Sequence, residues 1–443
     1  MSGVLKYVEV GFWKYSKRMM QKQLKGSNSS VTCLNCYRRN VELSWLTYIR
    51  LHFIILLYYI CFSSGSGEKH RNEENMRKEK KPKTHKVLKF IGRFFLVLLS
   101  FLLITFVGAY AALWLICHGP SPAARDLFVS TILETGQMKF LASWYFSEEE
   151  ILAITGRNGM THNEEEVDPD MIVIPAQSSA VNSGEEEQEL PDVEIVEISG
   201  HSFFAKLMIV RDPARIRLAT IYPWSDDAHS KSGLTLEQLV QQEDCIGGVN
   251  GGEYQSLGNW GGQPKGLVVC SGEIQFNVPQ AGDVMIGFNE DNVLIIADTG
   301  NMSARQVEAF VADNQIRDAV SFKDIDDGDD NHFTKLIING TATELSGSGS
   351  GANPRTAIGQ KADGTVLLLV TDGRGAGGHL GATARDLISI MQEYGAVNAA
   401  NLDGGSSSAM YYDGTYEMSS VTLYYATSSW LLPTAFVVDK KED

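Results

Sequence analysis

The chain has 443 residues and an acidic composition, with 38 Lys and Arg against 54 Asp and Glu and a formal net charge of −16 at pH 7. This charge argues against nucleic acid as a general partner, because phosphate backbones attract basic surfaces. The length predicts two or three structural units.

Residues 1–75 are interpreted as an N-terminal extension of uncertain status. The stretch "SWLTYIRLHFIILLYYICF" is apolar but is interrupted by Arg50 and His52, so a second membrane span and an interfacial segment both fit it. Met76 is the first residue of a basic segment that precedes the apolar run. Our hypothesis is that translation begins at this methionine. Cys33 and Cys36 form a C-x-x-C without a second pair at zinc-ribbon spacing, which makes a metal site there a weak interpretation.

An apolar run of 24 residues, Phe94 to Cys117, contains no charged side chain. About 20 apolar residues suffice for a helix to cross a bilayer, so residues 94–117 are predicted to be a transmembrane helix. Eight Lys and Arg lie between Arg77 and Arg93, which places the basic segment 76–93 in the cytoplasm and the following chain outside the cell membrane. A buried helix of a soluble core and a cleaved signal peptide ending at the "AYA" of Ala109 are the alternatives. The length of the apolar run favours an uncleaved, single-pass anchor.

Residues 118–156 have a helical pattern and are predicted to form a membrane-proximal helical stalk. Residues 157–192 carry two runs of three glutamates, at Glu164 and Glu185, among Ser and Asn. Such a composition buries too little apolar surface to offset chain entropy, so this segment is predicted to be a solvated acidic linker.

Residues 193–443 are predicted to form one folded domain with a sizeable core. Short apolar runs predict strands, and the Asn-Gly at Asn339 and Asp-Gly at Asp363 predict hairpin turns. Helices are expected at 303–314 and at 383–395, where Thr383 and Asp386 approximate a capping box. The predicted class is α/β to α+β, a single mixed-sheet domain with few helices.

Two polar motifs precede the last third of this domain. "GGVNGGEY" places Asn250 before Gly251 and Gly252, which permits close approach of a ligand to the backbone or forms a type I′ hairpin turn. "NPRTAIGQ" places Arg355 at the start of an apolar strand. The fork of an arginine binds phosphate through two hydrogen bonds, although a surface ion pair is the simpler reading of a lone arginine.

Two predicted strands each end in an aspartate. "VLLLVTDGRG" runs into Asp372 and Arg374, and "AVNAANLDGGSSS" runs into Asp403 after a helix. Neighbouring parallel strands joined by a right-handed helix bring their carboxyl ends together, so we expect these residues in one cleft. Paired carboxylates with an arginine suit cleavage at a phosphorylated anomeric carbon.

Other chemistries fit less well. Gly373, Gly375 and Gly378 match G-x-G-x-x-G, but too little chain follows Asp403 to complete a dinucleotide-binding sheet. There is no G-x-S-x-G elbow. "DIDDGDDNH" lacks the glutamate that ends a calcium loop, so it is interpreted as a solvated acidic loop with room for incidental cation binding. His379 fits an acid/base or a ligand role, although an isolated loop histidine more often has neither. Cys245 and Cys270 fit a disulfide or two buried thiols equally well.

Four blocks, "NGG", "RTAIG", "DGR" and "NAANLDGGSSSAM", occur in this order at wide spacing. Together they resemble the phosphodiester glycosidase family over about residues 193–438, and the anchor and acidic linker resemble its bacterial membrane-bound members. The resemblance implies hydrolysis of a sugar-1-phosphodiester at the glycosidic bond. Glu253 departs from the aromatic residues usual after "NGG", and Ser406 stands where a third glycine is usual.

The resemblance also implies a set of site residues. Asn250 and Gly251 would border the sugar, Arg355 would bind the phosphodiester, and Asp403 would lie on the catalytic floor as acid/base or nucleophile. The predicted catalytic carboxylates are Asp403, Asp372 and Glu253. The predicted substrate-binding residues are Asn250, Gly251, Gly252, Arg355, Thr356, Arg374, Asn401, Gly404, Gly405 and Ser407. No metal ligand set is predicted and no cofactor is required, with room left for a divalent cation.

The resulting hypothesis is a membrane-anchored extracytoplasmic glycosidase that acts on sugar phosphodiesters of cell-envelope or exopolysaccharide glycans. The alternative is a non-catalytic envelope-glycan binding protein that uses the same cleft.

Overall fold

The computed structural model describes residues 84–135, 138–175, 191–224, 231–255, 260–323, 333–419 and 428–441. The predicted extension 1–75, the proposed start at Met76, residues 76–83 of the basic segment and the acidic loop 324–332 lie outside these residues. The chain divides into two compact units, Met1–Ala109 and Tyr110–Asp443.

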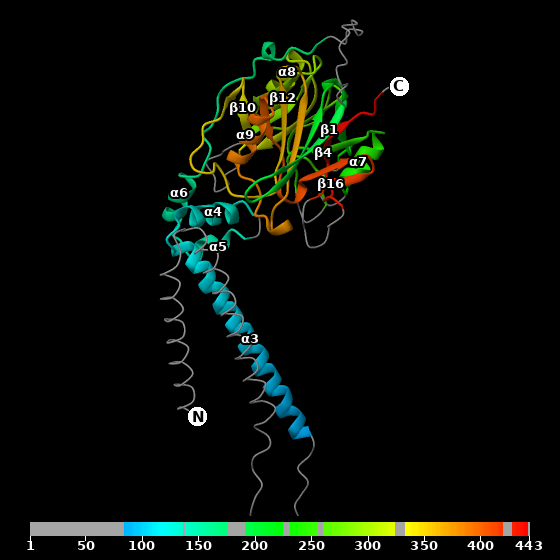
Figure 1. Ribbon diagram of the computed structural model, residues 1–443. Helices are drawn as coiled ribbons and strands as arrows, with labels where there is room; N and C mark the ends of the chain where they lie inside the picture. Colours follow the sequence, from blue (N-terminus) through cyan, green and yellow to red (C-terminus); the bar gives the residue numbers. More distant parts are fainter. Residues whose placement is uncertain are drawn as a thin grey trace, which may run out of the picture. The chain divides into compact units, whose positions relative to one another are not determined.

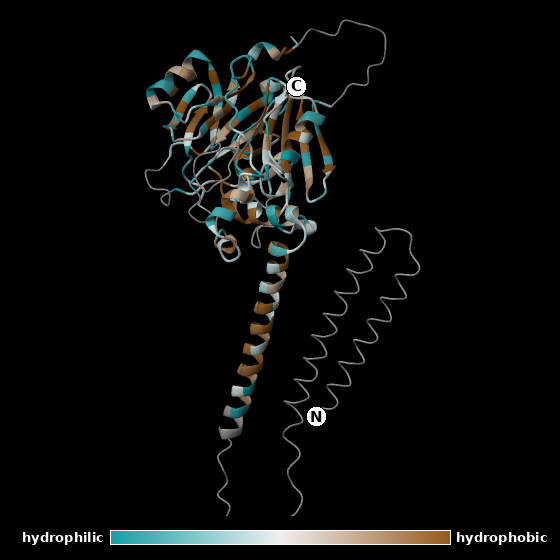
Figure 2. Ribbon diagram, turned by 90° about the vertical axis from the view of Figure 1, so that its left-hand side faces the viewer, coloured by the Kyte–Doolittle hydropathy of each residue, from teal (hydrophilic) through white to brown (hydrophobic). Residues whose placement is uncertain are grey.

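Helix α3 (Thr84–His118) contains the whole apolar run predicted to span a membrane. By length and composition, its Lys89–His118 portion is long and apolar enough to cross a bilayer, and it is the one such helix among the described residues. Figure 2 shows hydrophobic residues, coloured brown, along much of its length. The hydroxyls of Ser100 and Thr105 donate to Leu96 O (2.7 Å) and Phe101 O (2.9 Å), so these polar groups are satisfied inside the helix, as a lipid environment requires.

Three short helices follow: α4 (Pro122–Leu133), α5 (Phe140–Ser143) and α6 (Glu148–Thr155). Ser121 caps α4, and Ser147 with Glu150 forms a capping box that begins α6. Figure 1 shows the three helices gathered beside one end of the folded strands. They share a small apolar core with Cys117, composed of Val129, Ile132, Leu133, Ala142, Phe146 and Ile154.

The rest of the domain consists of three sheets, in which every described strand pair is antiparallel. The first sheet has the order β1-β2-β13-β12-β14-β10-β11, with bounds Val193–Ser199, Phe204–Val210, Val366–Thr371, Thr356–Lys361, Ala396–Asn401, Lys335–Ile338 and Thr341–Ala342. The second has the order β16-β15-β4-β17-β3, with bounds Thr415–Ser419, Ala409–Tyr412, Gly247–Asn250, Thr434–Val438 and Ile216–Thr220. The third has the order β6-β5-β9-β7-β8, with bounds Glu273–Val278, Gly266–Cys270, Ile316–Lys323, Asp283–Asn289 and Leu294–Asp298.

The three sheets share one central core, and each carries one helix on its outer face. Side chains from all three sheets, such as Leu368, Phe436 and Ile286, pack together in the centre. Helix α9 (Ala384–Glu393) covers the first sheet, α7 (Leu236–Gln242) the second and α8 (Ala304–Asp313) the third. Strand β13 is therefore buried on both faces, which explains its unbroken apolar sequence. Short 3₁₀ helices lie at Pro169–Met171, Pro213–Arg215, Ala376–Gly378 and Gly405–Ser407.

The α+β class and the small number of helices agree with the prediction. Helices α8 and α9 were both predicted, and Thr383 and Asp386 form the expected capping box. Asn339 and Gly340 form the turn between β10 and β11, both with positive φ. Helix α7 was not predicted, although its Thr235–Gln238 capping box is a signal in the sequence. The division into three antiparallel sheets was not predicted either.

Residues 157–175 of the predicted acidic linker are mostly exposed, as expected, but they are attached to the domain. The buried ammonium of Lys335 donates to Asn163 O at 2.7 Å and pairs with Asp298 at 2.8 Å. Thr161 N donates to Glu344 O at 2.9 Å, and Asp168 N to Asn339 Oδ1 at 2.8 Å. This attachment was not predicted from composition. Residues 176–190 of the linker lie outside the described part of the chain.

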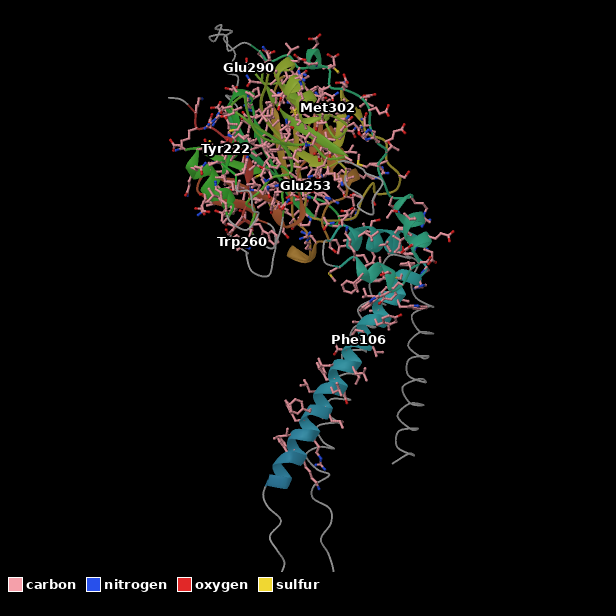
Figure 3. The ribbon with its side chains drawn as sticks, turned by 180° about the vertical axis from the view of Figure 1, so that it is seen from behind. Phe106, Tyr222, Glu253, Trp260, Glu290 and Met302 are labelled. Carbon is pink, nitrogen blue, oxygen red and sulfur yellow. The ribbon has the colours of Figure 1, made fainter. Side chains whose placement is uncertain are left out.

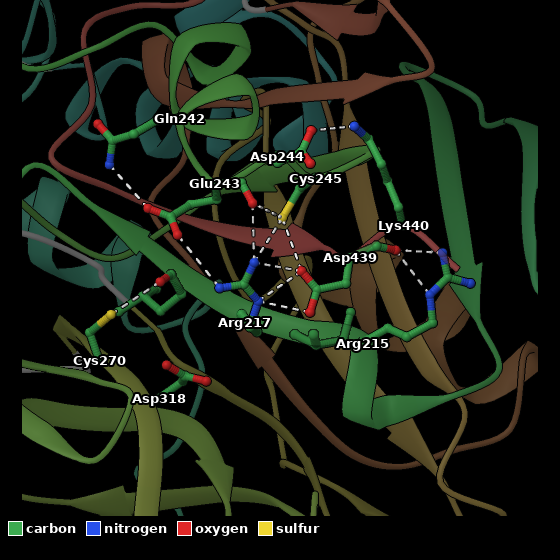
Figure 4. Close-up of polar contacts among 12 residues, drawn as sticks. Arg215, Arg217, Gln242, Glu243, Asp244, Cys245, Cys270, Asp318, Asp439 and Lys440 are labelled. Atoms are coloured by element: carbon green, nitrogen blue, oxygen red, sulfur yellow. Dashed lines mark hydrogen bonds and ion pairs between the residues drawn. The ribbon is translucent and has the colours of Figure 1, made fainter. Parts of the chain in front are cut away.

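Cys245 and Cys270 are both free thiols, which decides between the two alternatives left by the sequence. Figure 4 shows Cys245 beside the ion pair of Arg217 and Asp439, with its Sγ 3.2 Å from Asp439 Oδ1. Burial, followed by the hydrogen bond to Asp439, raises the pKa of Cys245 to about 12. Burial raises the pKa of Cys270 to about 11. Both groups are therefore thiols rather than thiolates at neutral pH.

Candidate functional site

The predicted site residues meet at one edge of the seven-stranded sheet. The prediction that β13 and β14 are neighbouring parallel strands is wrong, because β12 lies between them and is antiparallel to both. The carboxyl ends of β13 and β14 consequently flank the first residue of β12. This order places the segments after Thr371 and Asn401 on either side of Arg355, and it achieves the expected convergence through an antiparallel arrangement.

Asp403 is part-buried and held through its backbone. Asn250 Nδ2 donates to Asp403 O at 2.7 Å, and Gly404 N donates to the Asp403 carboxylate at 2.9 Å. Burial, together with the negative charge of Glu253, raises the pKa of Asp403 to about 7, although hydrogen bonds from Ser407 and Gly404 act in the opposite direction. The carboxyl group therefore exchanges its proton close to neutral pH.

Glu253 lies three residues beyond the end of β4 and is labelled in Figure 3, well away from Glu290 and Met302. Its Oε1 accepts from Lys265 Nζ at 2.6 Å, and its backbone N–H donates to Ser321 O at 2.9 Å. The same Glu253 charge acts on Asp283, whose pKa burial raises to about 6. Asp403, Glu253 and Asp283 thus form an acidic group in which Lys265 is the compensating cation.

Tyr254 extends the site on the buried side of Asp403. Its hydroxyl lies 3.0 Å from Ser407 Oγ, and Ser407 is hydrogen-bonded to the Asp403 carboxylate. Burial raises the pKa of Tyr254, and the charge of Asp403 adds to that shift. The result is a chain of three side chains, Tyr254 to Ser407 to Asp403, that fixes the orientation of the carboxylate.

Arg374 lies against the turn that follows Asp403. Its Nη1 donates to Ser406 Oγ at 2.8 Å. A Cβ on Gly405 would lie 2.6 Å from Arg374 Nη2, so only glycine lets the guanidinium approach here. Gly405 also has a positive φ of 61°. Ser406, noted as a departure from the family pattern, is thus a partner of this arginine.

Arg355 is nearly buried, and its guanidinium carbon lies 4.9 Å from the centre of the Phe333 ring. Its Nη2 donates to Gly351 O at 2.8 Å and pairs with Glu134, which comes from the end of α4. Gly404 lies next to Arg355, because a Cβ there would be 3.0 Å from Pro354 O and 3.8 Å from Arg355 Cα. Both arginines therefore border the glycine turn after Asp403.

Asp372 has both carboxylate oxygens engaged. One accepts from Phe204 N at 2.7 Å, and the other lies 2.6 Å from His379 Nδ1. The sequence analysis read His379 as an isolated loop residue, but the structure makes it the partner of Asp372. An aspartate bonded to Nδ1 orients the ring and leaves Nε2 for other contacts, so Asp372 suits a positioning role better than a direct one.

Asn250, Thr356 and Asn401 are buried and bonded within the protein. Asn250 Oδ1 accepts from Thr356 Oγ1 at 2.7 Å and from Ala409 N at 3.2 Å. Asn401 Nδ2 donates to Phe333 O at 3.2 Å. Asn250 therefore ties β4 to β12 and β15 at the base of the site, and Asn401 ties β14 to the segment before β10.

Packing requires glycine at positions 251 and 252. A Cβ on Gly251 would lie 2.4 Å from Thr434 Oγ1, and one on Gly252 would lie 2.5 Å from Ser321 O. Neither residue has a positive φ, which excludes the type I′ turn that was the alternative reading. The two glycines let the end of β4 pass between β17 and β9.

Three residues of this region were missed by the sequence analysis. Tyr254 immediately follows the motif "NGGE", and this position next to predicted site residues is the sequence signal that could have identified it. Lys265 and Glu134 had no local signal, because a lysine in "GGQPKG" and a glutamate at a helix end are ordinary surface residues by sequence alone. Among the described residues, no group of three or more His, Cys, Asp or Glu side chains is arranged to hold a metal ion.

The chain is similar to several known proteins. The SPbeta prophage-derived uncharacterized protein YomE of Bacillus subtilis (strain 168) is 44% identical over 64 residues, which is 14% of this chain and 10% of that protein. The catalytic domain of zebrafish N-acetylglucosamine-1-phosphodiester alpha-N-acetylglucosaminidase, described as auto-inhibited by its pro-peptide, is 16% identical over 57% of this chain and 85% of that chain, with a TM-score of 0.39. A hypothetical protein from Synechocystis is 17% identical over 56% of this chain and 61% of that chain, with a TM-score of 0.34.

At these TM-scores neither solved structure bears on the roles of individual residues. The match to a family is more direct. It begins at Glu243, just before β4, and ends at Asp439, just after β17, so it contains Asp403, Glu253, Arg355 and Arg374. Residues 243–439 match the phosphodiester glycosidase family.

Proposed function

We propose that this domain hydrolyses the glycosidic bond of a sugar-1-phosphodiester. The observation that carries the proposal is the setting of Asp403, a part-buried carboxyl group with a pKa of about 7. It lies beside a glycine turn bordered by two arginines, Arg355 and Arg374. A general acid works best when its pKa is near the working pH, and guanidinium groups suit a phosphate.

The proposed reaction divides the work between these groups. Arg374 and Arg355 hold the phosphate through its non-bridging oxygens. Asp403 gives its proton to the bridging oxygen as the bond from that oxygen to the anomeric carbon breaks. Glu253 takes a proton from a water molecule, whose oxygen forms the new bond to the anomeric carbon. The products are a free sugar and a phosphomonoester, and solvent returns the protons to their starting groups.

The proposed substrates are phosphodiester-linked sugars of the cell envelope or of exopolysaccharides. Two observations support this class: the family of the domain and the apolar helix α3, which has the length and composition of a membrane anchor.

The test is the variant Asp403→Asn in the full chain. We expect hydrolysis of an N-acetylhexosamine-1-phosphodiester to fall by about 10²- to 10⁴-fold in kcat, the usual contribution of a general acid. Asp291→Asn, at an exposed turn between β7 and β8, is the matched control and should retain full activity. Unchanged turnover in Asp403→Asn removes this residue from the mechanism. Binding of the phosphodiester by the wild-type chain without any product would favour the glycan-binding alternative.

A further inference from the structure

Glu134 connects the helices that follow α3 to the candidate site. It is the residue at the C-terminal end of α4, and its side chain is only 7% exposed. Oε1 accepts from Gly351 N at 2.6 Å, while Oε2 accepts from Asn353 Nδ2 at 2.9 Å and pairs with Arg355 Nη2. One carboxylate therefore holds three points of the loop that leads into β12, although it lies 221 residues before Arg355 and outside the residues matched by the family.

A second contact shows that α4 is docked closely on this loop. Thr131 Oγ1 accepts from Ala352 N at 3.0 Å. A Cβ on Gly351 would lie 2.5 Å from Ser130 C and Thr131 N, so the loop backbone touches the helix backbone. Thr131 and Glu134 are three residues apart and share one face of the helix end. The contact is specific in both position and register.

These bonds determine where the Arg355 guanidinium points. Nη2 is shared among Glu134, Ser350 Oγ (3.2 Å) and Gly351 O (2.8 Å), and Nε donates to Ala382 O at 3.4 Å. The guanidinium is planar, so fixing Nε and Nη2 also fixes the direction of Nη1. Within the described part of the chain, Nη1 is the nitrogen that these bonds leave for a ligand.

We propose that Glu134 is a positioning residue of the site, which acts through Arg355. In this proposal the helical segment that follows α3 is part of the working site, and it orients the arginine that binds the phosphate. The inference rests on the proposed function, because it assigns phosphate binding to Arg355. A carboxylate at this place also balances one of the two arginine charges. That balance suits a phosphodiester, which carries a single negative charge.

The experiment is a double-mutant cycle in the full-length chain, with Glu134→Ala, Arg355→Ala and the pair. The probe is an N-acetylhexosamine-1-phosphodiester, with KM and kcat measured by product release and Kd by calorimetry. We expect Glu134→Ala to raise KM and Kd by about 10- to 100-fold, the usual effect of losing a hydrogen bond to a charged group, with a smaller change in kcat. In the Arg355→Ala background, Glu134→Ala should have no further effect.

Glu134→Gln keeps an acceptor for Gly351 N and should recover part of the affinity. Glu149→Ala, an exposed glutamate of α6, is the matched control and should behave as wild type. An unchanged KM in Glu134→Ala, a gain in activity, or an equal loss in the Arg355→Ala background would each overturn the proposal. A wild-type chain that binds the probe without cleaving it would refute the proposed hydrolysis, and the Kd cycle would still decide the role of Glu134. A chain that neither binds nor cleaves it refutes both.

Discussion

At the scale of single residues, Asp403 is the group whose environment departs most from that of a surface carboxylate. Burial raises its pKa from 3.8 to about 7. The folded chain consequently binds more protons than the unfolded chain between about pH 4 and pH 7, and the free energy of unfolding falls as pH rises through that window. Catalytic groups are often unfavourable for stability in this way.

Asp403→Asn removes this ionisable group. We expect the variant to be more stable than wild type above pH 7, by up to about 4 kcal/mol, with the difference shrinking toward pH 4. The measurement is the free energy of unfolding in detergent at pH 4, 6 and 8, with Asp291→Asn as the control. A difference that is the same at all three pH values would contradict the assigned pKa shift.

Lys265 is the cation that lowers the pKa of Asp403 and pairs with Glu253. Lys265→Met should raise the pKa of Asp403. If Asp403 acts as the acid, activity is lost as pH rises through its pKa, so the basic limb of the kcat/KM profile should move to higher pH. Lys361→Met is the control, because Lys361 pairs with Asp363 at the other end of β12. A shift of the limb to lower pH would be inconsistent with Asp403 as the acid.

At the scale of elements, the site depends on the order β13-β12-β14 and on the passage of β4 between two other strands. Asn250 lies at the end of β4 and bonds to the Asp403 backbone and to Thr356 on β12. The second sheet therefore supports a site at the edge of the first. Gly251 and Gly252 permit this arrangement by leaving room for Thr434 and Ser321.

Gly252→Ala separates a packing role from a substrate-binding role. The new Cβ would lie 2.5 Å from Ser321 O and 2.7 Å from Val320 Cβ, which is too close for either to stay in place. We expect a loss of about 1–3 kcal/mol in the free energy of unfolding, as for other overpacked positions. The unfolding free energy and the KM are measured together. Unchanged stability with an increased KM would instead indicate that Gly252 borders the sugar.

At the scale of the whole molecule, the sequence predicts a cytoplasmic N-terminal segment and an external domain. Eight Lys and Arg between Arg77 and Arg93 precede the apolar run. We expect protease added to intact cells to digest the domain while an N-terminal tag stays protected. Permeabilised cells, in which both ends are digested, are the control. Protection of the domain in intact cells would reverse the proposed orientation.

Helices α4 to α6 also matter at this scale, because a fragment that begins at Val193 lacks Glu134. Such a fragment contains every residue of the family match but not the carboxylate that holds Arg355. In the isolated domain, Arg355 would therefore lack its ion-pair partner Glu134.

Local patterns in the sequence determined much of this protein. The apolar run of α3, the alternating and continuous strands, the hairpin turn at Asn339 and the capped helices α8 and α9 follow from side-chain periodicity and turn chemistry within a few residues. The motifs around Asp403 and Arg355 likewise indicated the family. Only the tertiary structure decided that three sheets share one core, that β12 separates β13 from β14, and that Tyr254, Lys265 and Glu134 reach the site residues. The physical reason is that strand order and long-range ion pairs depend on how distant segments pack, and no local pattern links Glu134 to an arginine 221 residues away.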